Sequence, residues 1–254
     1  MSFAPTRAGE ISLRRRTEPR TDTVVYEVKL GEEVLMSSMF TIAEKALADL
    51  AIQRARSLRH TLTAGVATTA AEPLTVLVGG LGLGYTAVAA LRHGDVGGVD
   101  VIEALSPVIS WHQQRLLPVS EELLGDDRTR LLLADFFSVI GGQPIDDVSV
   151  LPAYDVIALD IDHAPDFVLH PEHESFYSED GLRGVAGRLS PLGVFGLWSD
   201  RAPDEAFMAT ARSVFDVVEA EVVGFDNALT GGRSSNTVYL AHSRSAQAPT
   251  QGSG

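Results

Sequence analysis

The residues with the clearest chemical potential are glycines that lie between two apolar runs. The glycine-rich run at 79–84 follows an apolar run at 74–78 and precedes an alanine-rich run at 86–91. Because glycine has no Cβ, the backbone N–H groups of such a loop can approach a nucleotide closely. Strand, glycine loop and helix start, in this order, are typical of nucleotide-binding proteins. The sequence therefore predicts a cofactor-binding loop formed by Gly79, Gly80, Gly82 and Gly84.

The glycine run alone does not identify its nucleotide. The glycines at 80, 82 and 84 depart from the strict dinucleotide spacing, and no Lys-Ser or Lys-Thr pair follows them. The missing pair excludes a phosphate loop for ATP or GTP. A nicotinamide-dependent oxidoreductase would use a similar loop, so that class of enzyme stays open at this point.

Polar and aromatic residues follow the next two expected strands. Glu103 ends the apolar run 99–103, about twenty residues beyond the glycines, where an acid can accept hydrogen bonds from ribose hydroxyls. Asp135 could receive an adenine amino group, and Phe136 or Phe137 could pack on the ring. The structural alternatives are a surface carboxylate at a strand end for Glu103 and a helix N-cap for Asp135.

A third acidic segment follows the apolar run 154–159. This run brings Asp160 to the carboxyl edge of the predicted sheet, where ligands bind in open α/β folds. Asp162 and His163 follow directly, and we take these three side chains as the candidate catalytic residues. The acidic and histidine residues of the loop match no standard metal-binding spacing, so we predict no metal site. Beyond Asp166 we expect a solvated loop.

The elements that position these residues alternate between strand and helix. The apolar runs predict strands at 74–78, 98–102, 129–133, 154–160 and 192–198. Helices are expected between them and after Pro203, near 84–93, 106–116, 135–140, 178–189 and 203–213. Two last strand-like runs, at 214–225 and 236–241, flank a turn and must pair antiparallel. This order predicts a doubly wound, seven-stranded Rossmann-like α/β sheet, similar to the class I S-adenosylmethionine-dependent methyltransferase fold with its antiparallel last strand.

The chain before residue 73 predicts a small separate unit. The runs 23–30 and 34–36 flank a Gly-Glu-Glu turn and indicate a β-hairpin. Thr41 and Glu44 have the spacing of a capping box that would open a helix. We therefore divide the chain into an N-terminal extension with hairpin and helix at 1–72, a nucleotide-binding domain at 73–242 and a disordered tail at 243–254.

Composition limits the classes of partner. The net charge of −14 argues against nucleic acid as a ligand and is compatible with a cationic small molecule, although acidity also serves solubility. The absence of cysteine excludes disulfides and thiolate chemistry. The polar N-terminus lacks the apolar core of a signal peptide, and the uncharged stretch 73–91 contains clustered glycines that favour a buried strand and turn over a membrane span. We expect a cytoplasmic protein that does not enter a membrane.

Taken together, these segments resemble the spermidine synthase (polyamine aminopropyltransferase) family. The resemblance covers about residues 74–200 and rests on several short segments, namely the glycine run 79–84, Val101-Ile102-Glu103, Ala134-Asp135, Tyr154 to Asp160 followed by Pro165, Phe176-Tyr177, and Leu189-Ser190-Pro191 followed by Gly193.

The resemblance implies a donor, an acceptor and roles for individual residues. The cofactor would be S-adenosyl-L-methionine or decarboxylated S-adenosylmethionine, with Glu103 at the ribose, Asp135 at the adenine and Asp160 at the amine of a small acceptor. Aromatic faces could help to hold the cations, with Tyr85, Trp111 and Trp198 as candidates. Related proteins are often dimers, which implies a homodimer here.

Departures from the family pattern concern the amine-binding carboxylates. The family's glycine loop contains an aspartate where this chain has Gly82, and its second active-site aspartate corresponds to His163 here, beside Asp162. We therefore expect alkyl transfer from an S-adenosylmethionine-type donor, with methyl transfer slightly favoured. The alternatives are a polyamine aminopropyltransferase and a non-catalytic nucleotide- or polyamine-binding protein.

Overall fold

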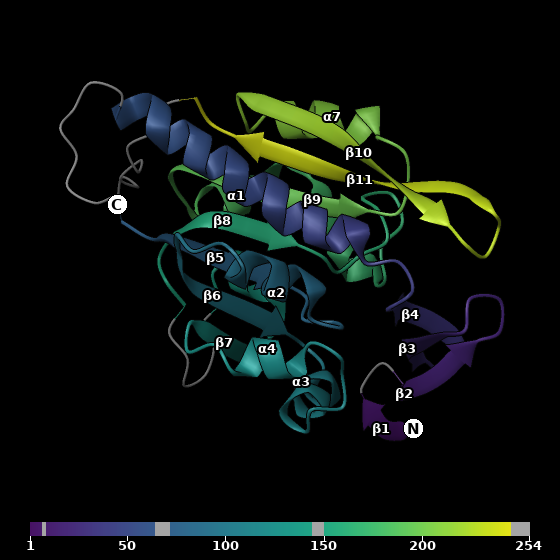
Figure 1. Ribbon diagram of the computed structural model, residues 1–254. Helices are drawn as coiled ribbons and strands as arrows, with labels where there is room; N and C mark the ends of the chain where they lie inside the picture. Colours follow the sequence, from purple (N-terminus) through teal and green to yellow (C-terminus); the bar gives the residue numbers. More distant parts are fainter. Residues whose placement is uncertain (7–8, 64–71, 144–149, 245–254) are drawn as a thin grey trace.

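The computed structural model describes residues 1–6, 9–63, 72–143 and 150–244. Its largest element is a seven-stranded sheet in the order β10-β11-β9-β8-β5-β6-β7 (Figure 1). The strands of this sheet, in chain order, are β5 (Leu74–Gly79), β6 (Val96–Glu103), β7 (Thr129–Leu133), β8 (Tyr154–Leu159), β9 (Leu189–Ser199), β10 (Val217–Asn227) and β11 (Gly232–His242). Strands β5 to β9 are parallel, and β11 is antiparallel to both β9 and β10.

Helices cover both faces of this sheet. The helices are α1 (Ile42–Thr63), α2 (Tyr85–Leu91), α3 (Ser106–Gln113), α4 (Ser120–Leu124), α5 (Phe136–Ile140), the 3-10 helix η1 (Pro171–Tyr177), α6 (Glu179–Ala186) and α7 (Glu205–Arg212). One apolar cluster contains side chains of α1 to α4, and the other contains side chains of α5, η1, α6 and α7. Neighbouring residues of β8 join different clusters, with Val156 on one face and Ile157 on the other. Because both faces are buried, the central strands are continuous apolar runs.

The predicted doubly wound α/β fold is confirmed, including the antiparallel end of the sheet. Strand β5 lies between β6, its successor in the chain, and β8, so the strand order reverses direction between β5 and β8. Ligands bind at such a switch point in open α/β sheets. The fold therefore places the glycine loop after β5 and Asp160 after β8 at the same edge.

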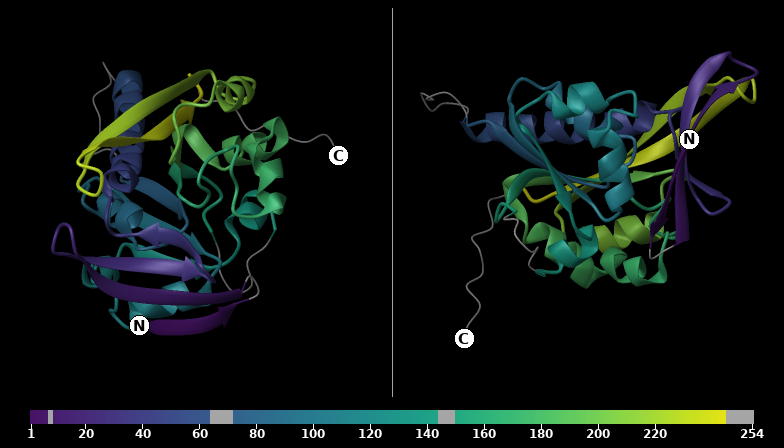
Figure 2. Two further views of the ribbon diagram at one scale, coloured as in Figure 1. Left: turned by 90° about the vertical axis from the view of Figure 1, so that its right-hand side faces the viewer. Right: turned by 90° about the horizontal axis from the view of Figure 1, so that it is seen from below.

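The N-terminal unit is larger than the single hairpin that we expect from the sequence. Strands β1 (Ser2–Thr6) and β2 (Gly9–Glu18) join β3 (Thr23–Leu30) and β4 (Glu33–Ser37) in a four-stranded antiparallel sheet. The three consecutive arginines of β2, Arg14 to Arg16, interrupt any apolar pattern, which is why the sequence does not signal this strand. Arg16 instead pairs with Glu27 on β3 and with Glu18. This sheet lies beyond the carboxyl ends of the parallel strands (Figures 1 and 2).

Helix α1 connects the two sheets and packs on the larger one. Its Leu47 and Ala51 approach Gly196 of β9, where a Cβ would lie 2.9 Å and 3.3 Å from them. The domain boundary that we predict between residues 72 and 73 stays a prediction. Residues 245–254 of the predicted tail lie outside the described ranges.

Candidate functional site

The glycine loop is held in a conformation that requires its glycines. Gly80, Gly82 and Gly84 have φ values of 92°, 48° and 88°, a region that side-chain-bearing residues rarely adopt. A Cβ on Gly80 would lie only 2.3 Å from the carbonyl oxygen of Asp160, so the loop and the end of β8 are in direct contact. A Cβ on Gly79 would overlap the ring of Phe136 at 2.6 Å. The backbone of this loop therefore lies close to its neighbours and carries no side chains at these positions. Such a loop is suited to binding a nucleotide through its backbone N–H groups.

His112 supports this loop from below, a role that the sequence does not reveal. The side chain is fully buried, and burial lowers its pKa, so the ring is neutral. Its Nε2 lies 3.0 Å from the carbonyl oxygen of Gly82, and its Nδ1 lies 3.1 Å from Oγ of Ser120. Since a carbonyl only accepts hydrogen bonds, Nε2 carries the proton and the Ser120 hydroxyl donates to Nδ1. The shape of the loop thus depends on α3 and α4 as well as on its glycines.

Glu103 lies beneath the loop, where its carboxylate binds the loop backbone. It accepts hydrogen bonds from the backbone N–H groups of Leu81 at 3.2 Å, Gly82 at 3.4 Å and Leu105 at 2.8 Å. The side chain is 8% exposed, and burial raises its pKa. This carboxylate therefore fixes the loop in place. Its contact with a ribose stays a prediction.

Asp135 and Phe136 lie at the start of α5. Asp135 is exposed and is the N-cap of α5, because its Oδ1 accepts a hydrogen bond of 2.7 Å from the backbone N–H of Ser138. Phe136 is 1% exposed and packs into the core against Gly79 and Phe176. Phe137 is only partly buried and lies on His173 with a ring separation of 4.0 Å. Of the two phenylalanines, Phe137 is the one within reach of the surface, and adenine binding by Asp135 stays a prediction.

Asp160 lies in a cavity of about 290 Å³ between the glycine loop, α1 and β4. The hydroxyl of Thr86 lies 2.6 Å from its Oδ2 and 3.2 Å from the carbonyl oxygen of Glu44. The residues around this cavity come from both sheets, and they are Val34, Leu35, Met36, Ser37, Phe40, Glu44, Leu81, Gly82, Leu83, Gly84, Tyr85, Asp160, Ile161, His163 and Trp198. The structure thus brings Asp160 and His163 to one cavity, and their catalytic role stays a prediction.

Glu44 is the second acidic residue of this cavity. From the sequence we expect it only as part of a capping box. It lies in the first turn of α1 and faces Asp160. Burial, followed by the nearby Asp160, raises the pKa of Glu44 to about 8. Burial also raises the pKa of Asp160 to about 6, against the opposing hydrogen bond from Thr86. Two carboxyl groups with such pKa values together carry one proton and one negative charge near neutral pH.

Asp162 lies outside the cavity and anchors the loop that follows β8. Its side chain is fully buried, and its two oxygens accept hydrogen bonds, each 2.8 Å long, from the backbone N–H of Leu169, from Nδ1 of His173 and from the hydroxyl of Tyr177. In the segment up to Glu174 that we expect to be a solvated loop, His170, Glu172 and Glu174 are exposed, but part of it forms the helix η1, which ends in the buried Phe176 and Tyr177. This geometry gives Asp162 a structural role. Its assignment as a catalytic residue is untested.

Of the three aromatic residues proposed to hold cations, two line the cavity and Trp111 does not. Tyr85 and Trp198 line the cavity. Lys45 lies 5.1 Å from the ring centre of Tyr85, and the indole N–H of Trp198 has no hydrogen-bond partner within the described ranges. Trp111 is 2% exposed and donates a hydrogen bond of 3.0 Å to Ser2 of β1, away from the cavity.

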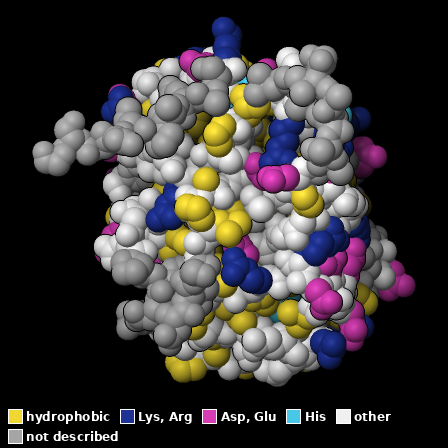
Figure 3. All heavy atoms as spheres, turned by 90° about the vertical axis from the view of Figure 1, so that its left-hand side faces the viewer, with side chains coloured by type: hydrophobic (Ala, Val, Ile, Leu, Met, Phe, Trp, Pro, Cys, Tyr) yellow, Lys and Arg dark blue, Asp and Glu magenta, His cyan; other side chains and the backbone are white. Residues whose placement is uncertain are grey.

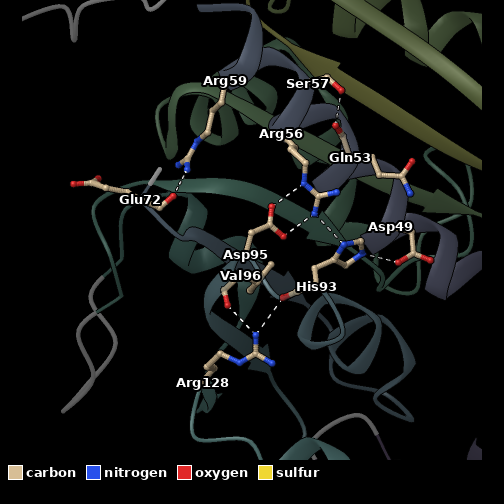
Figure 4. Close-up of polar contacts among 10 residues, drawn as sticks. All are labelled: Asp49, Gln53, Arg56, Ser57, Arg59, Glu72, His93, Asp95, Val96 and Arg128. Carbon is tan, nitrogen blue, oxygen red and sulfur yellow. Dashed lines mark hydrogen bonds and ion pairs between the residues drawn. The ribbon is translucent and has the colours of Figure 1, made fainter. Parts of the chain in front are cut away.

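The opposite edge of the sheet carries a network of ion pairs. Basic and acidic side chains lie side by side on this face (Figure 3). Arg56 donates two hydrogen bonds to Asp95, and Asp49 lies 2.8 Å from Nε2 of His93 (Figure 4). Arg128 binds the carbonyl oxygens of His93 and Val96 (Figure 4). The pairs of Arg56 with Asp95 and of His93 with Asp49 join α1 to the segment before β6.

Residues 1–6, 9–63, 72–143 and 150–244 also bear on metal binding and on membrane insertion. Within those ranges, no three His, Cys, Asp or Glu side chains are arranged as a metal site. In the same part of the chain, no helix is long and apolar enough to cross a membrane.

Solved structures share this architecture. A spermidine synthase from Thermotoga maritima matches with a TM-score of 0.64 and 16% identity over 97% of this chain and 73% of its own. A spermidine synthase in complex with the transition-state analogue AdoDATO gives a TM-score of 0.63 and 18% identity over 94% of this chain and 71% of its own. Human methyltransferase-like protein 13 in complex with SAH matches with a TM-score of 0.52 and 22% identity, over 83% of this chain and 84% of its own. The predicted likeness to spermidine synthases and class I methyltransferases is confirmed at the level of the fold.

No protein-family model matches the chain, and no curated protein matches it by sequence. Because one fold can carry many reactions, the chemistry must be argued from the site itself.

Proposed function

We propose that this protein is a transferase that moves an alkyl group from an S-adenosylmethionine-type donor to a small acceptor that bears an amine. The observation that carries the proposal is the cavity in which the glycine loop, Asp160 and Glu44 meet at the switch point of the sheet. Here a backbone that admits a nucleotide lies beside two carboxyl groups that attract a cation. An enzyme that transfers an alkyl group from a sulfonium to an amine needs both features.

Donor binding is assigned to the residues after β5, β6 and β7. The loop glycines Gly79, Gly80, Gly82 and Gly84 offer backbone to the donor without Cβ atoms in the way. Glu103 and Asp135, at the ends of two neighbouring strands, are the proposed ribose and adenine contacts. The donor supplies an electrophilic carbon next to a sulfonium.

The role of the chain's own side chains is to bind the acceptor and remove a proton. An amine arrives as an ammonium and must lose a proton before its nitrogen can attack. Asp160, ionised above a pKa of about 6, can bind the ammonium and accept that proton. The N–C bond then forms as the C–S bond breaks, and its electron pair stays on sulfur. Alignment of the two reactants in one cavity contributes about 7 kcal/mol or more to such reactions.

The choice between methyl and aminopropyl transfer rests on two observations. Met36 fills the space next to Gly82, since a Cβ there would lie 3.2 Å from its Sδ. This apolar contact replaces the carboxylate that would hold an aminopropyl amine, and it favours methyl transfer. Conversely, the described cavity lining contains no Lys or Arg to bind the donor's carboxylate, which supports the decarboxylated donor and makes aminopropyl transfer the second candidate.

Calorimetry with S-adenosylmethionine, decarboxylated S-adenosylmethionine and NADH tests the proposal. We expect binding of the first two and none of NADH, with the complete donor bound more tightly. Tighter binding of the decarboxylated donor would reverse the preference for methyl transfer. Binding of NADH alone would overturn the proposal in favour of an oxidoreductase. Binding of a donor without turnover of any amine would indicate a binding protein.

A further inference from the structure

The cavity has one polar end and one apolar wall. The polar end consists of Glu44, Asp160 and His163, which come from α1 and from the loop after β8. Val34, Leu35 and Met36 of β4 line the apolar side, which we call the apolar wall, and Sδ of Met36 reaches the glycine loop at Gly82. Phe40, Leu81, Leu83, Ile161 and Trp198 extend this wall. Its volume of about 290 Å³ lies at the low end of small-molecule sites, which span about 300–1,000 Å³.

The polar end carries one negative charge, which can neutralise one bound cation. With a pKa of about 6 for Asp160 and about 8 for Glu44, the pair holds one proton and one negative charge at neutral pH. Thr86 links the two residues, because its hydroxyl lies within hydrogen-bond distance of the carboxylate of Asp160 and the carbonyl oxygen of Glu44. An ammonium bound between two carboxyl groups would therefore neutralise the pair without a second cation.

The apolar wall contains no carboxylate that could bind a second cation. Apart from Glu44 and Asp160, the described lining contains no acidic side chain. The position next to Gly82 is taken by the thioether of Met36. A linear diamine in this cavity would leave its second ammonium without a carboxylate partner, which is costly, whereas an apolar body would be buried there favourably.

We infer that the acceptor is an amphipathic monoamine, whose ammonium lies between Glu44 and Asp160 and whose apolar body packs along β4. This inference rests on the proposed function for the role of acceptor, and it adds the chemical class of that acceptor. It also assigns Glu44 to acceptor binding.

Matched amines test the inference by calorimetry on the full chain near pH 7.5. We expect 3-phenylpropylamine to bind at least tenfold more tightly than 1,4-diaminobutane. Glu44→Ala, which removes the whole carboxyl group, should weaken binding of the monoamine about tenfold. Glu33→Ala, which removes an exposed carboxylate of β4 outside the cavity, should leave it unchanged. Tighter binding of the diamine, or an unchanged affinity in Glu44→Ala, would overturn the inference.

A variant that gains affinity completes the test, because an unfolded protein could lose binding but could not gain it. Leu35→Glu places a carboxylate on the apolar wall, so it should raise the affinity for 1,4-diaminobutane about tenfold relative to 3-phenylpropylamine. If the variant still prefers 3-phenylpropylamine to the same degree, the apolar body of the acceptor does not lie along β4. Donor binding is measured separately. Loss of donor binding alone would overturn the proposed function, and loss of monoamine preference alone would overturn only this inference.

Discussion

At the scale of single residues, burial determines what the cavity carboxyl groups can do. Asp160 keeps a pKa of about 6, which leaves it ionised at neutral pH as a proton acceptor. Glu44 has its pKa raised to about 8 and stays protonated there. The groups that face Glu44 are Asp160 across the cavity, Lys45 on its own helix and Tyr85 on α2. Two acids of similar type therefore differ in charge because their surroundings differ.

This protonation predicts a pH dependence of stability. The pKa of Glu44 is higher in the folded state than its ordinary value of 4.5, so the folded state holds this proton more tightly. The stabilisation is present below about pH 4.5 and is lost as the pH rises to about 8. Glu44→Gln should flatten this part of the curve and raise the free energy of unfolding near pH 9 by about 2 kcal/mol. Urea denaturation at several pH values measures the effect. A curve parallel to that of the wild type would contradict it.

At the scale of elements, Asp162 holds η1 and the loop before it against the sheet. One buried carboxylate binds a backbone N–H, an imidazole and a phenol from three points of the segment 169–177. The buried ring of Tyr177 adds the apolar contact, and burial together with Asp162 raises the pKa of its hydroxyl. The segment is therefore a fixed part of the fold, next to the loop that carries His163.

Replacement of this anchor should destabilise the protein. In Asp162→Asn, one acceptor oxygen becomes an N–H₂ group, and at least one of its three donors loses its partner. We expect the free energy of unfolding to fall by about 1–3 kcal/mol, measured by urea denaturation. The control is Asp166→Asn, which removes an exposed ion pair with Arg201. That change should cost no more than about 1 kcal/mol. Equal effects in the two variants would show that Asp162 is not an anchor.

At the scale of the whole molecule, the cavity exists because two sheets meet. The seven-stranded sheet supplies the glycine loop, Asp160 and Trp198, and the N-terminal sheet supplies Val34 to Ser37 of β4. Figure 2 shows the small sheet next to the carboxyl edge of the large one. The contact of Met36 with Gly82 joins the two. Neither sheet alone lines this cavity.

A substitution at this contact should change the choice of donor. Gly82→Asp restores a carboxylate at a position whose φ of 48° aspartate tolerates better than most residues. Because its Cβ would lie 3.2 Å from Sδ of Met36, we pair the change with Met36→Ala. The pair of changes should raise affinity for the decarboxylated donor about tenfold relative to the complete donor, whose own carboxylate it repels. The same pair with Gly82→Asn is the control. An equal shift there would contradict an electrostatic cause.

Much of the fold is encoded locally and can be predicted. The apolar runs at 74–79 and 154–159 bury both of their faces, and no other arrangement suits them as well as central parallel strands. The predicted strand 129–133 agrees in both bounds with β7. Strands β1 and β2 are missed because their stability comes from pairing and ion pairs. Helix η1 is missed because its anchor, Asp162, lies earlier in the chain.

The sequence by itself determined the βαβ order, the glycine loop and the placement of Glu103, Asp135 and Asp160 after successive strands, because each follows from patterns within a few residues. Only the tertiary structure decided which carboxylates share a cavity. Glu44 and Asp160 lie far apart in the chain and meet because α1 packs across the sheet beside the switch point. Asp162, two residues from Asp160, points into a different environment. Charge, access and proton affinity depend on burial, and burial is a property of the assembled fold.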